Sequence, residues 1–514
     1  MFKKILIANR GEIAVRILRA CRELGIQSVA VFSEVDRKSL HVRLADEAYA
    51  IGPAPSRESY LRVDKLMDVA RRAGCDAVHP GYGFLAENPA LPRACNEAGI
   101  TFIGPAAEAM EALGSKTAGR QLARRVEVPT VPGTNNPTEK AEAQALAQGM
   151  GYPVLLKAVA GGGGKGMRLV YSDAEFDSAF RDAASEAMNA FGDERLYLEK
   201  YLERPRHIEI QILADAHGRV VSLGERECSI QRRHQKVIEE APSPVVTPEL
   251  RRKMSEAAVR LARAGGYINA GTMEFLVDQN LQFYFLEVNT RLQVEHPVTE
   301  QVTGLDLVKL QIAIAAGHRL PFAWESITPR GHAMEVRLYA EDPENNFFPS
   351  PGKILSRHTP TGPGIRMDEG VYEGWTVPND YDPLLSKLIA WGNSREETIA
   401  RLRRALDEYT ITGIRTNAGL FRHILDEPEF LRGEIHTRWL DELLRRPRAV
   451  ATGAASGDFK EEADANAARE AAAIAAAIWQ ANQNLAQAFA ASSASETPSR
   501  WKMEGRREQL DRMP

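Results

Sequence analysis

A glycine-rich segment between two apolar runs holds the first residues that could do chemistry. Residues 161–166 read Gly-Gly-Gly-Gly-Lys-Gly, with Lys157 closing the predicted strand before them and a second predicted strand, 168–171, after them. Glycines let backbone N–H groups approach phosphate oxygens closely, and lysines neutralise phosphate charge. A Walker A loop would need Ser or Thr at Gly166 and a helix after it. The pattern favours a phosphate-binding loop of another kind, with a flexible hairpin turn as the alternative.

The carboxylates of Glu274 and Glu287 are expected to face each other across a β-hairpin. Residues 272–277 and 281–288 read as two strands around a polar turn at 278–280. Antiparallel pairing about that turn places the two glutamates opposite each other. Two facing carboxylates suit a hard divalent cation that also binds substrate phosphates. The hairpin therefore predicts a metal site.

From Glu287 to Glu295, every second residue is polar. The set is Glu287, Asn289, Arg291, Gln293 and Glu295. In an extended chain these side chains share one face. An ordinary solvent-facing strand is the alternative, but Asn, Arg and Gln are poor choices for such a surface. We expect an extended strip that combines the metal pair with a basic anion clamp.

Two further segments carry weaker signals. The basic run at 231–236, Gln-Arg-Arg-His-Gln-Lys, could be a solvated charge run or a nucleic-acid patch, but beside a nucleotide and a metal it would bind a small anion. The run at 79–83, His-Pro-Gly-Tyr-Gly, follows a predicted strand at the edge where doubly wound sheets place ligands, although a plain turn is an equal reading. Neither segment assigns a function by itself.

Composition narrows the class of protein without naming an activity. The 514 residues are 44% hydrophobic, and 65 Lys plus Arg against 69 Asp plus Glu give a formal net charge of −4. This balance argues against a strongly basic nucleic-acid binder and a polybasic membrane protein. The longest clean apolar run, 471–479, is too short for a membrane span, and charges at 3–12 interrupt any secretory signal. Four widely spaced cysteines favour a reduced, cytoplasmic protein.

The elements that would position these residues begin with alternating strands and helices. Predicted strands are 5–8, 28–32, 77–79 and 101–103, and predicted helices are 12–24 and 60–73. This alternation predicts the α/β class, with a doubly wound parallel sheet that has helices on both faces. The first turn, Asn9-Arg10-Gly11-Glu12, lacks the GxGxxG fingerprint, so we expect no dinucleotide site there.

Five motifs together resemble biotin carboxylase, the ATP-grasp component of biotin-dependent carboxylases. They are Asn9 to Ala14, His79 to Phe84, the glycine loop, Gln231 to Lys236, and Glu287 to Pro297. The resemblance covers residues 1 to about 446 in order, and the combined motifs are highly specific. Ala160 and Lys165 stand where the bacterial enzyme more often has Gly and Arg, two departures that should preserve a flexible, cationic phosphate lid.

The resemblance implies a fold of four segments with mixed α/β and α+β elements. These are an N-terminal biotin carboxylase domain at 1–114, an ATP-grasp domain at 115–330 with a small lid module at about 131–204, a mixed-β C-terminal domain at 331–446, and a linker with an alanine-rich tail at 447–514. The tail lies outside the resemblance. Helical spacing of its apolar residues predicts a helix. The alanine-rich helix and residues 499–506 resemble small subunits of biotin-dependent decarboxylase complexes, which implies a docking element for a partner subunit, with Trp501 as anchor and a disordered tail as the alternative.

The resemblance also implies a role for each matching residue. The ATP-binding set is Lys116, Lys157, Gly162, Gly163, Gly164, Lys165, Gly166, Glu199, Lys200, Leu202, His207, Gln231 and His234. The set for Mg²⁺ or Mn²⁺ is Glu274, Glu287 and Asn289. The set for bicarbonate and biotin is Lys236, Arg291, Gln293, Val294, Arg337 and Tyr82. Glu295 would be the general base, and Arg337 would face the ureido oxygen of biotin.

The implied reaction is the ATP- and bicarbonate-dependent carboxylation of biotin through carboxyphosphate. The segment 338–345 resembles the α-subunit of acyl-CoA carboxylases, which favours an acetyl- or propionyl-CoA system, with pyruvate as runner-up. No Ala-Met-Lys-Met biotinylation motif is present, so the biotin carboxyl carrier protein and the carboxyltransferase should be separate chains, in a complex with a homodimer or larger assembly. The alternatives are another ATP-grasp ligase and a nucleotide-sensing protein. The Glu274/Glu287 pair and Arg291 favour catalysis.

Overall fold

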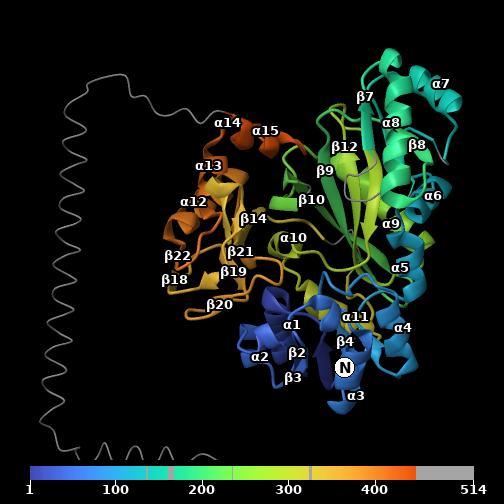
Figure 1. Cartoon of the computed structure of the whole chain (residues 1–514). Coiled ribbons are helices and arrows are strands. Elements are labelled where there is room, and N and C mark those ends of the chain that lie inside the picture. The colour runs from blue at the N-terminus through green and yellow to red at the C-terminus, as the bar shows by residue number, and fades with distance from the viewer. Residues whose placement is uncertain (135–136, 160–166, 234, 323–326, 447–514) are drawn as a thin grey trace, which may run out of the picture. The chain divides into compact units, whose positions relative to one another are not determined.

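A five-stranded parallel sheet with strand order β3-β2-β1-β4-β5 forms the N-terminal part of the chain (Figure 1, blue). Its strands are β1 (Lys4–Ile7), β2 (Gln27–Ser33), β3 (Glu47–Gly52), β4 (Ala77–His79) and β5 (Thr101–Phe102). The predicted doubly wound sheet is confirmed, but the prediction missed β3. Up to its buried Ile51, this edge strand alternates between half-buried and exposed residues, so it lacks the run of buried residues that marks β1 and β2.

Helices cover both faces of this sheet. They are α1 (Gly11–Glu23), α2 (Leu40–Leu44), α3 (Val63–Arg72) and α4 (Ala90–Glu97), with 3₁₀ turns at Glu34–Asp36 and Ser56–Glu58. The next two helices, α5 (Ala107–Gly114) and α6 (Lys116–Arg125), instead share a core with Phe275 and Phe285. Ile5 and Ile7 of β1 pack in one core with Ile13 and Ile17 of α1. Leu6 packs in another core with residues of α3 and α4. Alternate residues of one strand therefore anchor opposite helical layers.

The computed structural model describes residues 1–134, 137–159, 167–233, 235–322 and 327–446. The predicted glycine loop, His234 and the alanine-rich tail lie outside these residues. Met1–Arg445 forms one compact unit. Within the described part of the chain, no helix has both the length and the apolar character that a membrane crossing requires.

A small antiparallel sheet with order β7-β6-β8 corresponds to the predicted lid module. Its strands are β6 (Val154–Ala158), β7 (Met167–Val170) and β8 (Leu196–Lys200), packed with α7 (Lys140–Met150) and α8 (Asp173–Phe191). Val154, Leu156 and Ala158 alternate along β6 and share a core with Phe176 of α8. Strands β6 and β7 pair antiparallel, and the glycine-rich residues lie between them in sequence.

An eight-stranded antiparallel sheet, β13-β12-β9-β10-β11-β14-β21-β19, carries most of the candidate site (Figure 1). The strands are β9 (Arg206–Ala214), β10 (Val220–Arg232), β11 (Gln235–Ala241), β12 (Asn269–Val277), β13 (Phe283–Asn289), β14 (His332–Tyr339), β19 (Ile365–Glu369) and β21 (Leu384–Gly392). Because β11 pairs with β14, the sheet runs without a break across the domain boundary expected at residue 330.

Helices and short strands complete the part of this unit that follows β8. The helices are α9 (Pro248–Ala264), α10 (His296–Thr303), α11 (Leu307–Ala315), α12 (Arg395–Glu408), α13 (Ala418–Asp426), α14 (Pro428–Leu431) and α15 (Trp439–Arg445), with a 3₁₀ turn at Pro343–Asn345. The short strands are β15 (Glu341–Asp342), β16 (Phe348–Pro349), β17 (Gly352–Lys353), β18 (Ser356–His358), β20 (Thr376–Val377) and β22 (Thr410–Thr412).

The predicted hairpin is confirmed, and Glu274 pairs directly with Glu287 between β12 and β13. The predicted extended strip is wrong beyond Asn289, where β13 ends. The chain turns, and α10 begins at His296 with Glu295 as its N-cap. Pro297 explains the early start of this helix, because its fixed φ and missing N–H suit a first helical turn.

A buried charge cluster joins α1 to the large sheet. The Glu12 carboxylate of α1 lies 3.3 Å from Lys387 Nζ of β21, and Lys387 Nζ lies 3.9 Å from Asp368 of β19. Burial raises the pKa of Glu12 to about 7, and Lys387 limits this rise. Since a carboxyl group in the unfolded chain titrates near 4.5, folded Glu12 retains a proton over a range where the unfolded chain has released it.

Glu12→Gln should therefore change how stability depends on pH. A raised folded pKa means that the wild-type free energy of unfolding falls as pH rises from about 4.5 to about 7. Removing this titration should make the variant gain stability relative to wild type between about pH 5 and about pH 8, as measured by urea unfolding. Glu23→Gln, at the exposed end of α1, is the matched control. Parallel pH curves for Glu12→Gln and wild type would contradict the assignment.

Candidate active site

The ammonium group of Lys236 lies among three carboxylates that come from separate elements. Its Nζ donates to Glu209 of β9 at 2.5 Å, to Glu274 of β12 at 2.8 Å and to Glu295 at 2.7 Å. The Lys236 side chain is only 12% exposed, and Glu209 is fully buried. Burial opposes the charge, but the three carboxylates raise the pKa of Lys236 well above its usual range. Sheet order β12-β9-β10-β11 brings these residues together.

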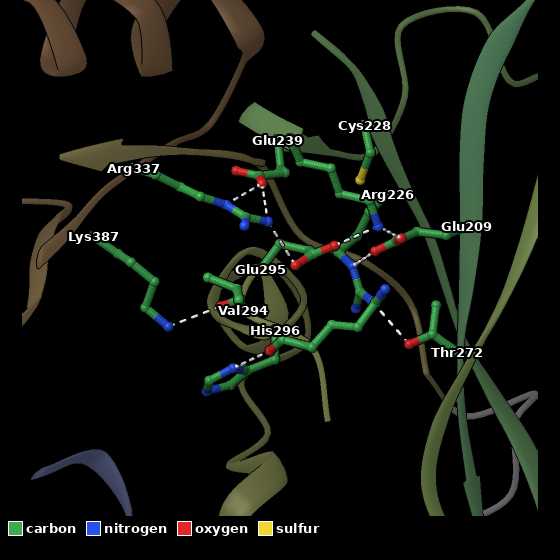
Figure 2. Close-up of polar contacts among 12 residues, drawn as sticks. Glu209, Arg226, Cys228, Glu239, Thr272, Val294, Glu295, His296, Arg337 and Lys387 are labelled. Carbon is green, nitrogen blue, oxygen red and sulfur yellow. Dashed lines mark hydrogen bonds and ion pairs between the residues drawn. The ribbon is translucent and has the colours of Figure 1, made fainter. Parts of the chain in front are cut away.

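Glu295 is held ionised at the start of α10. It accepts hydrogen bonds from Lys236 Nζ at 2.7 Å and from Arg337 Nη2 at 2.9 Å. Burial alone would raise its pKa, but Lys236, Arg337 and Arg226 hold that pKa well below its usual range. Figure 2 shows Glu295 between Arg337 on one side and Arg226 and Glu209 on the other. An unprotonated carboxylate in this position can accept a proton from a bound substrate.

Glu274 gathers several donors on one carboxylate. Oε1 accepts from Lys236 Nζ, Asn289 Nδ2 and Gln293 Nε2, each at 2.8 Å, and Oε2 lies 3.0 Å from His207 Nε2. Burial opposes ionisation, but Lys236 and His207 hold its pKa well below the usual range. His207, Glu209 and Glu274 each place a ligand atom within 4.8 Å of the others. With half-buried Glu287 directly opposite, this donor set fits a hard divalent cation.

Arg226 of β10 is a fully buried residue whose hydrogen bonds connect several site residues, and it was not among the residues predicted from the sequence. Its guanidinium donates to Glu209, and to Gln211 at 2.7 Å, Gln293 at 2.9 Å, Thr299 at 2.9 Å and Thr272 at 3.2 Å. It thereby fixes Glu209 against Lys236 and joins β9, β12 and α10 (Figure 2). An arginine in the middle of a long, otherwise buried strand was the available signal.

Arg291 lies at the edge of this network. Its Nε donates to Glu87 at 3.0 Å, and its Nη2 donates to Asn289 Oδ1 at 3.0 Å. Glu87 follows the 79–84 turn in sequence and was not identified as a site residue. Arg291 therefore reaches Glu274 only through Asn289 among the described contacts.

The predicted nucleotide-binding residues divide into two groups. Glu199 of β8 pairs with Lys157 of β6 and with Arg120 of α6, and the sequence analysis missed Arg120. Lys200 donates to the Gly151 carbonyl at 2.9 Å, Leu202 is half-buried, and Lys116 is the first residue of α6.

The second group lies at the large sheet. Gln231 Nε2 is 2.9 Å from His207 Nδ1, which connects this group to Glu274. Two predicted nucleotide-binding residues therefore lie beside the Lys236 network. The predicted residues Gly162, Gly163, Gly164, Lys165, Gly166 and His234 lie outside the described residues.

Arg337 of β14 lies between two carboxylates. Its Nε donates to Glu239 of β11 at 2.7 Å, and its Nη2 donates to Glu295. Tyr82, from the 79–84 turn, has a buried hydroxyl for which no hydrogen-bond partner is present among the described residues. Its ring centre lies 5.9 Å from Lys387 Nζ, which in turn donates to the Val294 carbonyl at 2.8 Å. The structure thus brings Val294, Glu295 and Arg337 together.

Ionised carboxylates held by cations on a large antiparallel sheet, with a small antiparallel sheet before it in sequence, are typical of an ATP-grasp ligase. Residues 115–323 match the family described as carbamoyl-phosphate synthase L chain, ATP binding domain. Residues 1–110 match the biotin carboxylase N-terminal domain, and residues 335–442 match the biotin carboxylase C-terminal domain. The chain belongs to the biotin carboxylase family, and its activity is that of a biotin carboxylase, a ligase.

Relatives and solved structures agree with this assignment. Biotin carboxylase of Halalkalibacterium halodurans is 54% identical over 446 residues, which cover 87% of this chain and 98% of that protein. A pyruvate carboxylase component from Methanothermobacter thermautotrophicus is 55% identical over 447 residues, covering 87% and 91%. The biotin carboxylase domain dimer of Hydrogenobacter thermophilus 2-oxoglutarate carboxylase, solved with MgADP, ADP and bicarbonate, has a TM-score of 0.79 and 48% identity, covering 86% and 98%.

Proposed function

We propose that this chain carboxylates biotin on a separate carrier protein, using ATP and bicarbonate, with Glu295 as the base. The observation that supports this assignment is the buried, ionised Glu295 between Lys236 and Arg337. Lys157 and the lysine-containing glycine loop would bind ATP phosphates, together with Lys116, and Glu199, Lys200, Leu202, His207, Gln231 and His234 would complete the nucleotide site. Bicarbonate would lie against Lys236, Arg291, Gln293 and the Val294 backbone.

The metal would be held by Glu274, Glu287 and Asn289. Mg²⁺ or Mn²⁺, when bound, would neutralise charge on the transferring phosphoryl group. Glu274 contributes an ionised carboxylate whose orientation is fixed by Asn289 and Gln293, and Glu287 faces it from the next strand. Both glutamates present oxygen ligands, which hard cations prefer.

Proton transfer determines the roles of the remaining residues. Glu295 would take the bicarbonate proton while a bicarbonate oxygen attacks the γ-phosphorus of ATP, releasing ADP and forming carboxyphosphate. Carboxyphosphate would split into CO₂ and phosphate, and the phosphate would remove the N1′ proton of biotin. N1′ then attacks CO₂, while Arg337 stabilises the negative ureido oxygen and Tyr82 lies beside the ring. A bound anion would share the charge of Lys236 and so make Glu295 more basic than in the ligand-free site.

Glu295→Gln should lower biotin carboxylation by about 10²- to 10⁴-fold, because an amide cannot take the bicarbonate proton. ATP affinity should stay within about twofold of wild type, since Glu295 contacts none of the proposed nucleotide residues in the described chain. Labelled bicarbonate incorporated into free biotin measures the first quantity, and equilibrium ATP binding measures the second. Glu397→Gln, on the exposed side of α12, is the control. Near-normal turnover of Glu295→Gln would remove the base assignment.

Glu287→Gln should raise the Mg²⁺ concentration needed for half-maximal activity by about tenfold or more. Mutating a residue that only hydrogen-bonds to a metal ligand already lowers metal affinity by about 10- to 100-fold, and a direct ligand should matter at least as much. The measurement is a titration of free Mg²⁺ at constant MgATP. Asp278→Asn changes a carboxylate in the turn of the same hairpin and should leave the titration unchanged. Coincident curves for Glu287→Gln and wild type would show that Glu287 is not a metal ligand.

We propose an acyl-CoA of the acetyl or propionyl type as the downstream acceptor. The support is the resemblance of segment 338–345 to acyl-CoA carboxylase α-subunits. A keto acid such as pyruvate is the second candidate, because the relatives include a pyruvate carboxylase and a 2-oxoglutarate carboxylase beside methylcrotonoyl-CoA carboxylases. The biotin carboxyl carrier protein and the carboxyltransferase would be separate chains, around a homodimer or larger assembly of this chain. We place the enzyme in the cytoplasm, consistent with four buried, unbridged cysteines.

The complex purified from its native source should contain a biotinylated carrier chain and a carboxyltransferase chain. With ATP and bicarbonate, it should carboxylate acetyl-CoA or propionyl-CoA faster than pyruvate or 2-oxoglutarate. The reverse preference would overturn the acyl-CoA assignment. A complex that forms equally well after deletion of 449–514 would overturn the proposed docking role of the tail.

A further inference from the structure

Two side chains outside the proposed substrate contacts bind the backbone carbonyls of Gln293 and Val294. His296 Nδ1 lies 2.8 Å from the Gln293 carbonyl, and Lys387 Nζ donates to the Val294 carbonyl at 2.8 Å. Figure 2 shows Lys387 reaching Val294 from the side opposite Arg226 and Glu209. Successive carbonyls of the segment that carries the base are therefore both occupied.

We propose that Lys387 is a positioning residue for the carboxylation reaction, which sets the backbone of Val294 and the carboxylate of Glu295 for bicarbonate. This inference rests on the proposed function of the site. Lys387 would not contact bicarbonate, ATP or biotin. It would act through the Val294–Glu295 peptide alone.

Peptide geometry connects these bonds to the site. In a trans peptide the C=O and the following N–H point in opposite directions. The bond from His296 to the Gln293 carbonyl therefore directs the Val294 N–H away from His296. In the same way, the bond from Lys387 to the Val294 carbonyl directs the Glu295 N–H away from Lys387. The two bonds fix both peptide planes that flank Val294.

Lys387 is itself placed by a rigid, buried setting. It lies on β21 directly opposite Arg337 of β14, and its side chain is fully buried. The carboxyl groups of Glu12, at 3.3 Å, and Asp368, at 3.9 Å, lie near its ammonium. Despite burial, Arg366 and Lys387 hold the pKa of Asp368 well below its usual range, so Asp368 supplies a negative charge. The bond at 2.8 Å to the Val294 carbonyl is shorter than either of these charge contacts, and it constrains the site segment directly. One sheet thus aligns Arg337 with Glu295 and Lys387 with the adjoining carbonyl.

A purely structural role predicts a different result from a positioning role. Loss of a structural ion pair lowers stability and leaves the kinetic constants of the folded enzyme unchanged. Loss of positioning lowers kcat and kcat/KM for bicarbonate, while the KM for ATP stays near wild type, because the proposed nucleotide residues lie on other strands. A displacement of about 1 Å at a reacting group can cost about 10²-fold in rate.

The experiment measures steady-state kinetics of full-length Lys387→Met with free biotin, varying bicarbonate and ATP separately. We expect kcat/KM for bicarbonate to fall about 10- to 100-fold, with the KM for ATP within about twofold of wild type. Lys387→Arg, which retains the charge and the donors, should recover much of the loss. Arg395→Met is the matched control, because Arg395 pairs with buried Glu240 and donates to the carbonyls of Phe430 and Leu431, away from the site segment.

The outcomes separate this inference from the proposed function. A folded Lys387→Met with wild-type bicarbonate kinetics overturns the positioning role alone. If Lys387→Met does not fold, the double variant Glu12→Gln/Lys387→Met removes the carboxylate left unpaired, and the same kinetic loss is expected relative to Glu12→Gln. A wild-type protein that shows no bicarbonate- and biotin-dependent ATP turnover overturns the proposed function and this inference with it.

Discussion

The ammonium of Lys236 between Glu209, Glu274 and Glu295 is the interaction on which the rest of the site depends. Three carboxylates converge where little water reaches, and buried carboxylates are stable only with cations or protons beside them. Lys236 cannot balance three negative charges alone. Arg226 supports Glu209, Arg337 supports Glu295, and His207 lies against Glu274. These cations together neutralise the three buried carboxylates around Lys236.

This arrangement also explains how one protein scaffold can supply both a base and an anion site. Lys236, one of the cations that keep Glu295 ionised, also belongs to the proposed bicarbonate contacts, so an arriving anion would meet an unprotonated base within one hydrogen-bonded cluster. Glu87 forms an ion pair with Arg291, and Glu199 forms an ion pair with Lys157. In the proposed reaction, bicarbonate would replace Glu87 at Arg291, and an ATP phosphate would replace Glu199 at Lys157. Each anion would then meet a cation that is already positioned.

Local patterns predicted the parts of the structure whose partners are near in sequence. The hairpin turn at 278–280 fixed the register of Glu274 with Glu287, and alternating apolar runs predicted the doubly wound sheet. The convergence on Lys236 could not be predicted from the residues alone, because it depends on strand order β12-β9-β10-β11. Arg226, Glu209 and Lys387 were missed for this reason. The turn between Asn289 and Glu295 was missed because the alternating polar residues favoured an extended strip, whereas Pro297 belongs to the first turn of α10.

In the proposed reaction, bicarbonate activated by Glu295 attacks the γ-phosphate of ATP before carbon reaches biotin. The most direct test uses bicarbonate labelled with ¹⁸O, together with ATP and biotin, and mass analysis of the phosphate released. One ¹⁸O atom is expected in each phosphate for each carboxybiotin formed, because the attacking oxygen stays on phosphorus when carboxyphosphate splits. Carboxybiotin formed alongside phosphate that carries no label would contradict it.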